Sequence, residues 1–208
     1  MPEQNSPENT VETADSKEGI PVQFYPLGGG HLIVATQLPI EVRSALPFEA
    51  LWSLRAPKVP SYRERHRPGP IYRQTYGASQ RCQKHRSKQP SIPTCLRSLV
   101  DWCRAFSKID FNSVAVEWQE VSGFDESRWV NACLVVPASP AVLATFGAPA
   151  VVNIGPLGWQ SDCRVLDLQM NDGEMLTIPK HTNTQFAHKI ESVDPFVGRR
   201  ITVTVMHY

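Results

Sequence analysis

The sequence predicts a mainly β protein of the α+β class: a double-stranded β-helix (jelly roll) core that follows a lobe of loops and helix. After Asp110 the chain shows eight short runs, several of them alternating between apolar and polar residues, as half-buried strands do. Turn residues separate these runs about every ten residues, a spacing typical of double-sheet β proteins. The 18 prolines in 208 residues disfavour a helical bundle, and the hydrophobic content of 41% is enough for a core.

The chain length indicates one domain with a tail. Residues 1–19 are polar and acidic and contain almost no large apolar side chains, so we expect them to be disordered. We expect the domain to span residues 20–208. Within it, residues 20–109 form the N-terminal lobe with a basic region, and residues 110–208 form the jelly-roll core.

The N-terminal lobe alternates between short regular elements and basic loops. Apolar runs around a turn of three glycines predict two strands, and the longest amphipathic run predicts a helix. Its buried face comprises Leu96, Leu99, Trp102, Cys103 and Phe106. The expected elements are strands at 22–27, 31–38 and 71–77, helices at 47–54 and 92–109, and loops at 55–70 and 78–93.

The core is predicted to consist of strands alone. Runs rich in Val, Ile, Leu and Phe are bounded by Gly, Pro, Asn and Asp, which break strands and form turns. The expected strands lie at 112–120, 129–136, 141–147, 150–155, 164–170, 174–178, 184–190 and 199–207.

Charge is distributed unevenly, although the formal net charge is only +1. Residues 1–20 carry a net charge of −4, whereas residues 55–88 carry ten basic residues and a single acid, Glu64. Such blocks predict partners rather than folds. The basic stretch favours RNA or DNA, and the acidic tail could compete with nucleic acid for it.

The cysteines indicate an intracellular, reduced protein. Their number, five, is odd, there is no Cys-x-x-Cys pair, and no apolar signal segment precedes them. Cys82, His85, Cys95 and Cys103 do not have the spacing of a common zinc finger. No apolar run approaches the roughly 18 residues that a membrane span needs, so we expect no membrane association.

Several separated motifs, in order, resemble the AlkB family of 2-oxoglutarate- and Fe(II)-dependent dioxygenases. The resemblance runs from about Phe24 to the C-terminus. "PIYRQTYG" (Pro70–Gly77) is similar to the family's nucleotide-lid strand, and residues 138–155 are similar to a core strand with its turn. Residues 166–193 are similar to the strands that lead to the distal histidine, and "RRITVTVMH" is similar to the closing strand. The resemblance implies Fe(II) and 2-oxoglutarate as cofactors if the protein is active.

The iron site that the resemblance implies is incomplete in this sequence. Two histidines and one carboxylate form the family's triad, and the first two ligands come from a His-x-Asp motif. No His-x-Asp or His-x-Glu occurs anywhere in the chain. When residues 125–132 are aligned with the family's motif, Val130 and Ala132 stand at the positions of the first two ligands. Only His188 matches a metal ligand of the family. A substitute site could combine His188 with Asp125 or Glu126. His181 would point away from His188 if residues 181–188 formed one strand.

The cosubstrate site implied by the resemblance is also altered. Glu117 and Gln119 stand where the family has an Asn-x-Tyr pair, and a carboxylate there would repel a dicarboxylate. Arg200 matches the first of two arginines on the closing strand, whereas Met206 replaces the second. Ile71 replaces the usual arginine of the lid. We therefore expect Arg200 to be the one remaining cofactor-binding residue, with no cofactor bound and no catalytic residue.

The basic stretch lies where the resemblance places the nucleotide-recognition loops. Lysine and arginine neutralise phosphates, and aromatic rings stack on unpaired bases. The predicted nucleic-acid contacts are Arg63, Arg65, Arg67, Arg73, Tyr76, Arg81, Lys84, Arg86 and Lys88.

Three functions remain open from the sequence. The first is an inactive AlkB-like module that binds nucleic acid. The second is an active RNA or DNA demethylase with a non-standard metal site. The third is a structural or interaction domain that binds a protein, possibly of viral origin.

Overall fold

The structure, a computed structural model, describes residues 12–15, 20–55, 71–78, 90–120, 140–157, 164–192 and 198–207. The strands are β1 (Glu12–Asp15), β2 (Pro21–Gly28), β3 (His31–Gln37), β4 (Ile71–Gly77), β5 (Ser113–Glu120), β6 (Ala141–Gly147), β7 (Ala150–Pro156), β8 (Leu166–Met170), β9 (Glu174–Ile178), β10 (Phe186–Ser192) and β11 (Arg199–Met206). The helices are α1 (Ile40–Ser44), α2 (Phe48–Ser53), α4 (Thr94–Ser107) and α6 (Lys180–Asn183).

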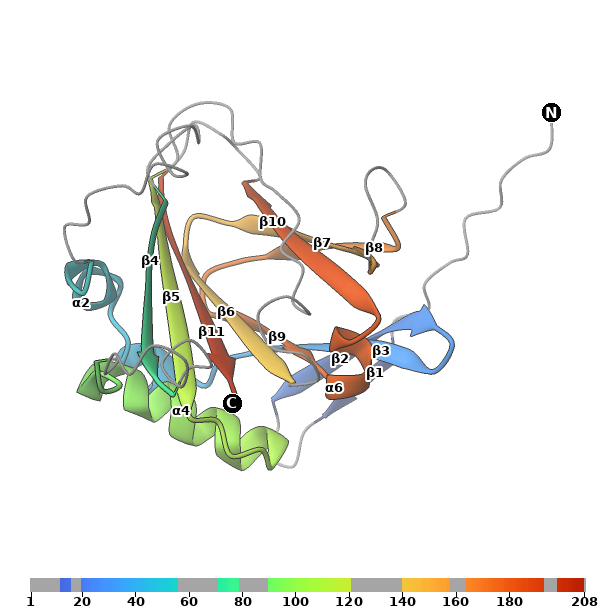
Figure 1. Cartoon of the computed structure of the whole chain (residues 1–208), viewed down its shortest axis with the longest axis horizontal. Helices are drawn as coiled ribbons and strands as arrows, with labels where there is room; N and C mark the ends of the chain where they lie inside the picture. Colours follow the sequence, from blue (N-terminus) through green and yellow to red (C-terminus); the bar gives the residue numbers. More distant parts are fainter. Residues whose placement is uncertain are drawn as a thin grey trace.

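The strands form two antiparallel sheets (Figure 1). The large sheet has eight strands in the order β1-β2-β3-β9-β6-β11-β5-β4, and the small sheet has the order β10-β7-β8. The expected mainly β, double-sheet architecture is therefore confirmed. Strands from both sides of residue 110 share the large sheet, because β3 pairs with β9 and β4 pairs with β5.

Two apolar clusters hold these layers together. The larger one lies between α4 and the outer face of the large sheet, and includes Leu99 of α4 with Ile201 and Val203 of β11. The second lies between the two sheets, where Leu143 and Leu176 meet Val152 and other residues of the small sheet. Alternate residues of a strand point to opposite faces, so β6 and β9 in the middle of the large sheet contribute to both clusters.

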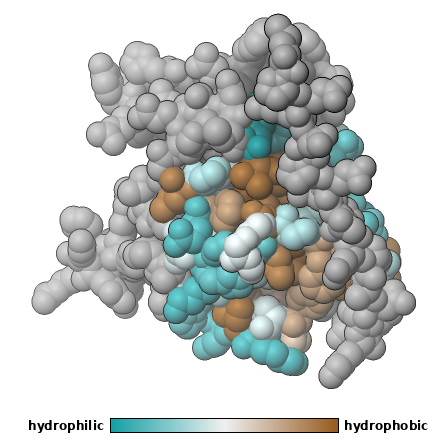
Figure 2. Space-filling view, turned by 90° about the vertical axis from the view of Figure 1, so that its right-hand side faces the viewer, coloured by the Kyte–Doolittle hydropathy of each residue, from teal (hydrophilic) through white to brown (hydrophobic). Residues whose placement is uncertain are grey.

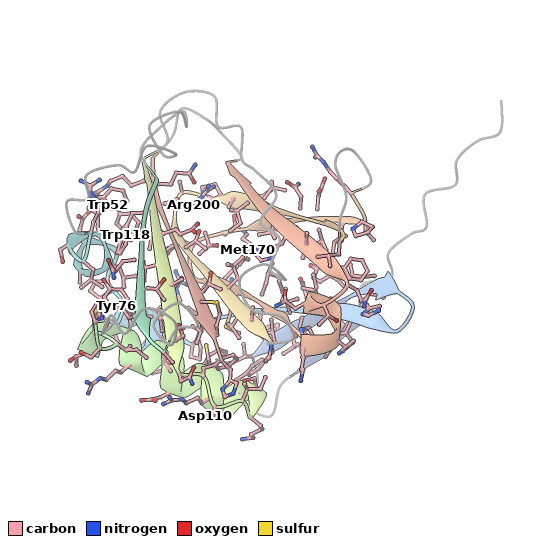
Figure 3. All side chains as sticks on the ribbon, in the orientation of Figure 1. Trp52, Tyr76, Asp110, Trp118, Met170 and Arg200 are labelled. Carbon is pink, nitrogen blue, oxygen red and sulfur yellow. The ribbon has the colours of Figure 1, made fainter. Side chains whose placement is uncertain are left out.

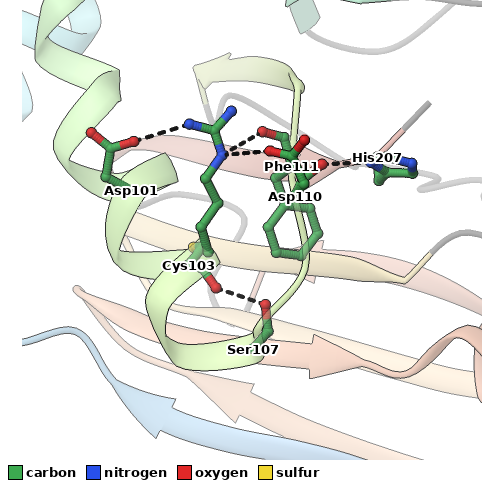
Figure 4. A network of polar contacts seen from close by, with 7 residues as sticks. Asp101, Cys103, Ser107, Asp110, Phe111 and His207 are labelled. Atoms are coloured by element: carbon green, nitrogen blue, oxygen red, sulfur yellow. Dashed lines mark hydrogen bonds and ion pairs between the residues drawn. The ribbon is translucent and has the colours of Figure 1, made fainter.

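Helix α4 confirms the predicted amphipathic face. Leu96, Leu99 and Cys103 are fully buried, while Trp102 and Phe106 stack with ring centroids 4.9 Å apart and pack against the same cluster. Arg104 follows the buried Cys103 in α4, and its guanidinium Nε donates a hydrogen bond to the carbonyl of Phe111, 2.8 Å away (Figure 4). It also pairs with Asp101 and Asp110, so the end of α4 is tied to the segment that enters β5.

The thiol of Cys103 provides a test of this packing. Burial raises its pKa from an ordinary value of 9.0 to about 12. Because the folded-state pKa is raised, the contribution of Cys103 to stability is complete below pH 9 and is lost as the pH rises toward 12. We expect iodoacetamide at about pH 8 to leave Cys103 unmodified and to alkylate half-buried Cys95 first, as read by peptide mass mapping. Equal alkylation of both thiols in the folded protein would contradict the packing.

Most predicted strands in the described part of the chain are confirmed, and two segments differ. Residues 12–15, expected to be disordered, form β1, which pairs antiparallel with β2 from Glu12↔Phe24 to Asp15↔Pro21. Backbone pairing at a sheet edge needs no apolar side chains, so the acidic composition gave no sign of it. Residues 181–188 are not one strand, because His181 lies in α6 and His188 in β10. The short α1 was not predicted, and the strand expected at 129–136 lies outside the described residues.

Candidate functional site

A row of polar residues crosses the inner face of the large sheet. In the β11 ladders, Arg200 lies opposite Gln119 of β5, and Thr202 lies between Glu117 of β5 and Thr145 of β6. Since Ile201 and Val203 face α4, Arg200 and Thr202 face the space between the sheets. The Thr145 hydroxyl confirms this direction, because it lies 3.7 Å from the sulfur of Met170 in the small sheet.

Arg200 is the most buried charged side chain among the described residues. It is only 2% exposed, and its Nη2 donates a hydrogen bond to the Oε1 of Gln119 (Figure 3). A guanidinium removed from water requires such partners, because an uncompensated buried charge costs several kcal/mol. Arg200 thus lies inside the molecule, where it is bonded to a neighbouring side chain.

His188 faces the same interior space from the small sheet. It lies opposite Ile154 in the β10–β7 ladder, and Ile154 belongs to the cluster between the sheets. Phe186 and Ile190 lie two residues before and two residues after His188 on β10, so all three side chains share one face of the strand. Phe186 and Ile190 pack against that cluster as well. The sequence therefore correctly placed His188 and Arg200 on core strands, and the structure turns both toward one interior.

The described residues do not assemble an iron site around His188. Among them, no group of three His, Cys, Asp or Glu side chains lies close enough to hold a metal ion. Asp125, Glu126, Val130 and Ala132 lie outside the described residues. Toward this interior the described strands turn the His188 imidazole, the Glu117 carboxylate and the Arg200 guanidinium, which is bonded to Gln119.

A second feature, the aromatic–arginine cluster, lies on the surface and consists of Phe48, Trp52, Arg55 and Arg199. The Phe48 and Trp52 rings stack with centroids 5.7 Å apart, one turn apart on α2. The Arg199 guanidinium lies 5.0 Å from the Phe48 centroid and 4.9 Å from the Trp52 centroid. Arg55 lies 5.0 Å from the Trp52 ring, so two cations contact one indole.

Glu49 and Trp118 hold this cluster in place. The Glu49 carboxylate accepts hydrogen bonds from Arg199, which fixes the guanidinium over the rings. The indole Nε1 of Trp118, on β5, donates to the Leu51 carbonyl at 2.8 Å and so ties α2 to the large sheet (Figure 3). The sequence did not predict this cluster, because Arg199 is 150 residues from Glu49. The pairing of two aromatic residues four apart on a short helix was the only local sign.

The predicted nucleic-acid contacts fare differently. Arg73 lies opposite Glu117 in the β4–β5 ladder. Tyr76 is only 7% exposed and packs in the larger apolar cluster, so its predicted stacking on a base does not fit. Strand alternation explains this, since Tyr76 pairs with buried Val114 on the α4 side. The remaining predicted contacts, Arg63, Arg65, Arg67, Arg81, Lys84, Arg86 and Lys88, lie outside the described residues.

Acidic β1 and basic β4 lie at opposite edges of the large sheet, with six strands between them. This order separates residues 12–15 from β4, the strand that belongs to the basic stretch, so the expected competition between the acidic tail and nucleic acid gains no support from β1. No helix in the described part of the chain is long and apolar enough to cross a membrane.

Comparisons with known proteins identify the fold. No family model and no curated protein matches the sequence. A solved structure described as "The structure of OsALKBH1" matches with a TM-score of 0.56 and 13% sequence identity, and the match covers 90% of this chain and 100% of that chain. The chain therefore has an AlkB-like fold, as the resemblance in its motifs predicted. At this level of identity the likeness concerns the fold alone.

Proposed function

We propose that this protein is a nucleic-acid-binding module with an AlkB-like fold that does not carry out iron-dependent oxidation. The observation that carries the proposal is the buried Arg200, bonded to the Gln119 amide at the position where the resemblance implies a bound cosubstrate. The proposal has two parts, the loss of cofactor binding and the retention of nucleic-acid binding, and each has its own support.

The interior argues against 2-oxoglutarate. The Gln119 oxygen accepts a hydrogen bond from the Nη2 of Arg200, so part of the donor capacity that a dicarboxylate would use is already taken. Glu117 lies opposite Thr202, one position further along the same face, and its negative charge would oppose a second carboxylate. Among the described residues, His188 does not belong to any group of three His, Cys, Asp or Glu side chains that could hold a metal ion. These features together favour a structural role for the polar row.

The surface supports nucleic-acid binding. The aromatic–arginine cluster combines two half-buried aromatic rings with two arginines, the residue types that proteins use to hold unpaired bases and their phosphates. Arg55 is also the first of the ten basic residues in the stretch 55–88, so the cluster adjoins that stretch in sequence. Salt-dependent binding of single strands is the behaviour that such a surface supports.

An active demethylase is the second candidate. It is favoured by one specific observation, that His188 and Arg200 both face the interior from opposite sheets. It requires Asp125 or Glu126 to complete a metal site with His188. A purely structural or protein-binding domain is the third candidate, and the absence of nucleic-acid binding would favour it.

The nucleic-acid part can be tested with charge-neutral variants of the cluster. We expect Arg55→Gln combined with Arg199→Gln to weaken binding of a fluorescein-labelled single-stranded oligonucleotide by roughly three- to tenfold at low salt. The slope of log K against log salt should become shallower by about 0.7 for each phosphate contact that is lost, and so by about 1.4 when both are lost. Fluorescence anisotropy between roughly 50 and 200 mM salt measures both quantities.

Arg164→Gln is the matched control. Arg164 pairs with Asp167 on the exposed side of β8, in the other sheet, so its loss removes one surface cation without affecting the cluster. Equal weakening by the control and the double variant would show that the effect comes from general charge. No detectable binding by the unaltered protein would overturn the nucleic-acid part of the proposal.

A further inference from the structure

A groove opens between the large sheet and β8. Its volume is about 300 Å³, at the lower end of the range for sites that hold small ligands. Ala35, Leu168, Met170 and Leu176 line its apolar part. The side of the molecule that carries β8 and the β2–β3 hairpin shows apolar and polar surface interleaved (Figure 2). The inner end is closed by Met170, which is 1% exposed and contacts Thr145 of the polar row.

Polar side chains line the same groove. Tyr25, Gln23, Gln37, Gln169 and Glu174 contribute a phenol, three amides and one carboxylate. Among the described residues that line the groove, Glu174 alone is charged. Its two carboxylate oxygens accept hydrogen bonds from the backbone and side-chain nitrogens of Asn171 at 2.7 and 3.3 Å. A carboxylate offers about four acceptor positions, so acceptor capacity remains for a ligand.

The Tyr25 phenol lies close enough to Glu174 to be affected by its charge. Its pKa is raised, first because the ring is removed from water and second because the Glu174 carboxylate disfavours a second negative charge. The hydroxyl is therefore protonated at neutral pH, and it donates to Gln23 Oε1 at 2.6 Å. The ring can contact a cation through its π face, while the phenol oxygen keeps a lone pair as an acceptor.

We propose that this groove is a binding site for a small organic cation, an ammonium group on an apolar alkyl or aryl body. The ammonium lies between Glu174 and Tyr25, and the body packs on Leu168, Met170 and Leu176. The charge of the groove carries this choice, because its described lining contains one carboxylate and no lysine or arginine. An anionic ligand would face Glu174 directly, and a neutral ligand would leave its charge without a counterpart.

Three molecules of matched shape test the proposal: 2-phenylethylammonium, 2-phenylethanol and 3-phenylpropanoate. Saturation-transfer NMR and calorimetry on the full chain measure their binding. We expect the ammonium to bind with a Kd of about 1 mM or below, since a ligand of this size makes few contacts and therefore binds weakly. It should bind at least about tenfold more tightly than the alcohol, and the carboxylate should not bind. The three molecules differ mainly in charge, which Glu174 attracts in the ammonium and repels in the carboxylate.

Two variants locate the site, and one serves as a control. Glu174→Gln keeps an oxygen for the Asn171 nitrogens and should remove the tenfold preference for the ammonium. Ala35→Leu fills the groove from β3 and should abolish binding of both the ammonium and the alcohol. Glu41→Gln removes an exposed carboxylate on α1 and should change nothing. Equal binding of ammonium and alcohol, binding that survives both groove variants, or no ammonium binding at all would overturn the proposal.

Discussion

Replacing Arg200 with alanine is expected to lower the free energy of unfolding by about 3 kcal/mol. The side chain is 2% exposed, so its removal leaves a cavity in the space between the sheets. It also removes the donor to Gln119 Oε1, which then loses a hydrogen bond inside the molecule. Urea unfolding followed by tryptophan fluorescence and far-ultraviolet circular dichroism measures the change.

A second substitution separates volume from charge. Arg200→Met restores most of the lost volume without a charge, so we expect it to cost no more than about 1 kcal/mol, because burial of the guanidinium is itself unfavourable. Arg164→Ala removes an exposed arginine and should cost less than about 0.5 kcal/mol. If Arg200→Ala were as mild as Arg164→Ala, Arg200 would not be the structural centre of the polar row.

The second large effect is expected at Gly147, where β6 ends beside the aromatic–arginine cluster. Its φ of +84° belongs to the region that favours glycine, and a Cβ would lie 2.5 Å from both the Arg199 carbonyl oxygen and the Phe48 ring. The strained backbone alone costs about 1 kcal/mol, and the clash with a backbone oxygen adds to it. We expect Gly147→Ala to destabilise the protein by about 3 kcal/mol.

Gly30→Ala is the control for this prediction. Gly30 has a similar φ of +77°, but a Cβ there would meet no atom within 4 Å. Its substitution should therefore cost only the backbone term of about 1 kcal/mol. Thermal and urea unfolding of the two variants give the difference. Equal destabilisation would mean that Phe48 and Arg199 can move aside, and that the cluster is not rigid.

Local patterns predicted most of the described strands because each buries one face or both. Strands β6 and β9 have the predicted bounds, since apolar runs there end at residues that break strands. The same patterns failed at β1, where Glu12 and Asp15 gave no apolar signal, and at α6, where Pro179 starts a short helix. A strand held by backbone pairing at a sheet edge and a four-residue helix both form without a periodic pattern of hydrophobic residues.

The position of a candidate site residue could be predicted from the sequence only where it depends on the strand that carries the residue. His188 and Arg200 follow from their places on β10 and β11. The basic residues around Tyr76 in the sequence did not indicate which face of β4 carries its side chain. In the structure the side chain packs in the apolar cluster that includes α4. The contacts of Arg199 with α2, and the groove beside β8, depend on strands brought together from distant parts of the chain. No spacing in the sequence encodes such contacts.

The most direct test of the account is an anaerobic calorimetric titration with Fe(II), or Mn(II) in its place, with and without 2-oxoglutarate. His188→Ala serves as the control. The account predicts no specific binding of metal or 2-oxoglutarate up to about 1 mM, and no difference between the unaltered protein and the variant. Micromolar metal binding that needs His188 and is strengthened by 2-oxoglutarate would contradict it. The protein would then have a rebuilt metal site, and alkylated oligonucleotides would be its next substrates to assay.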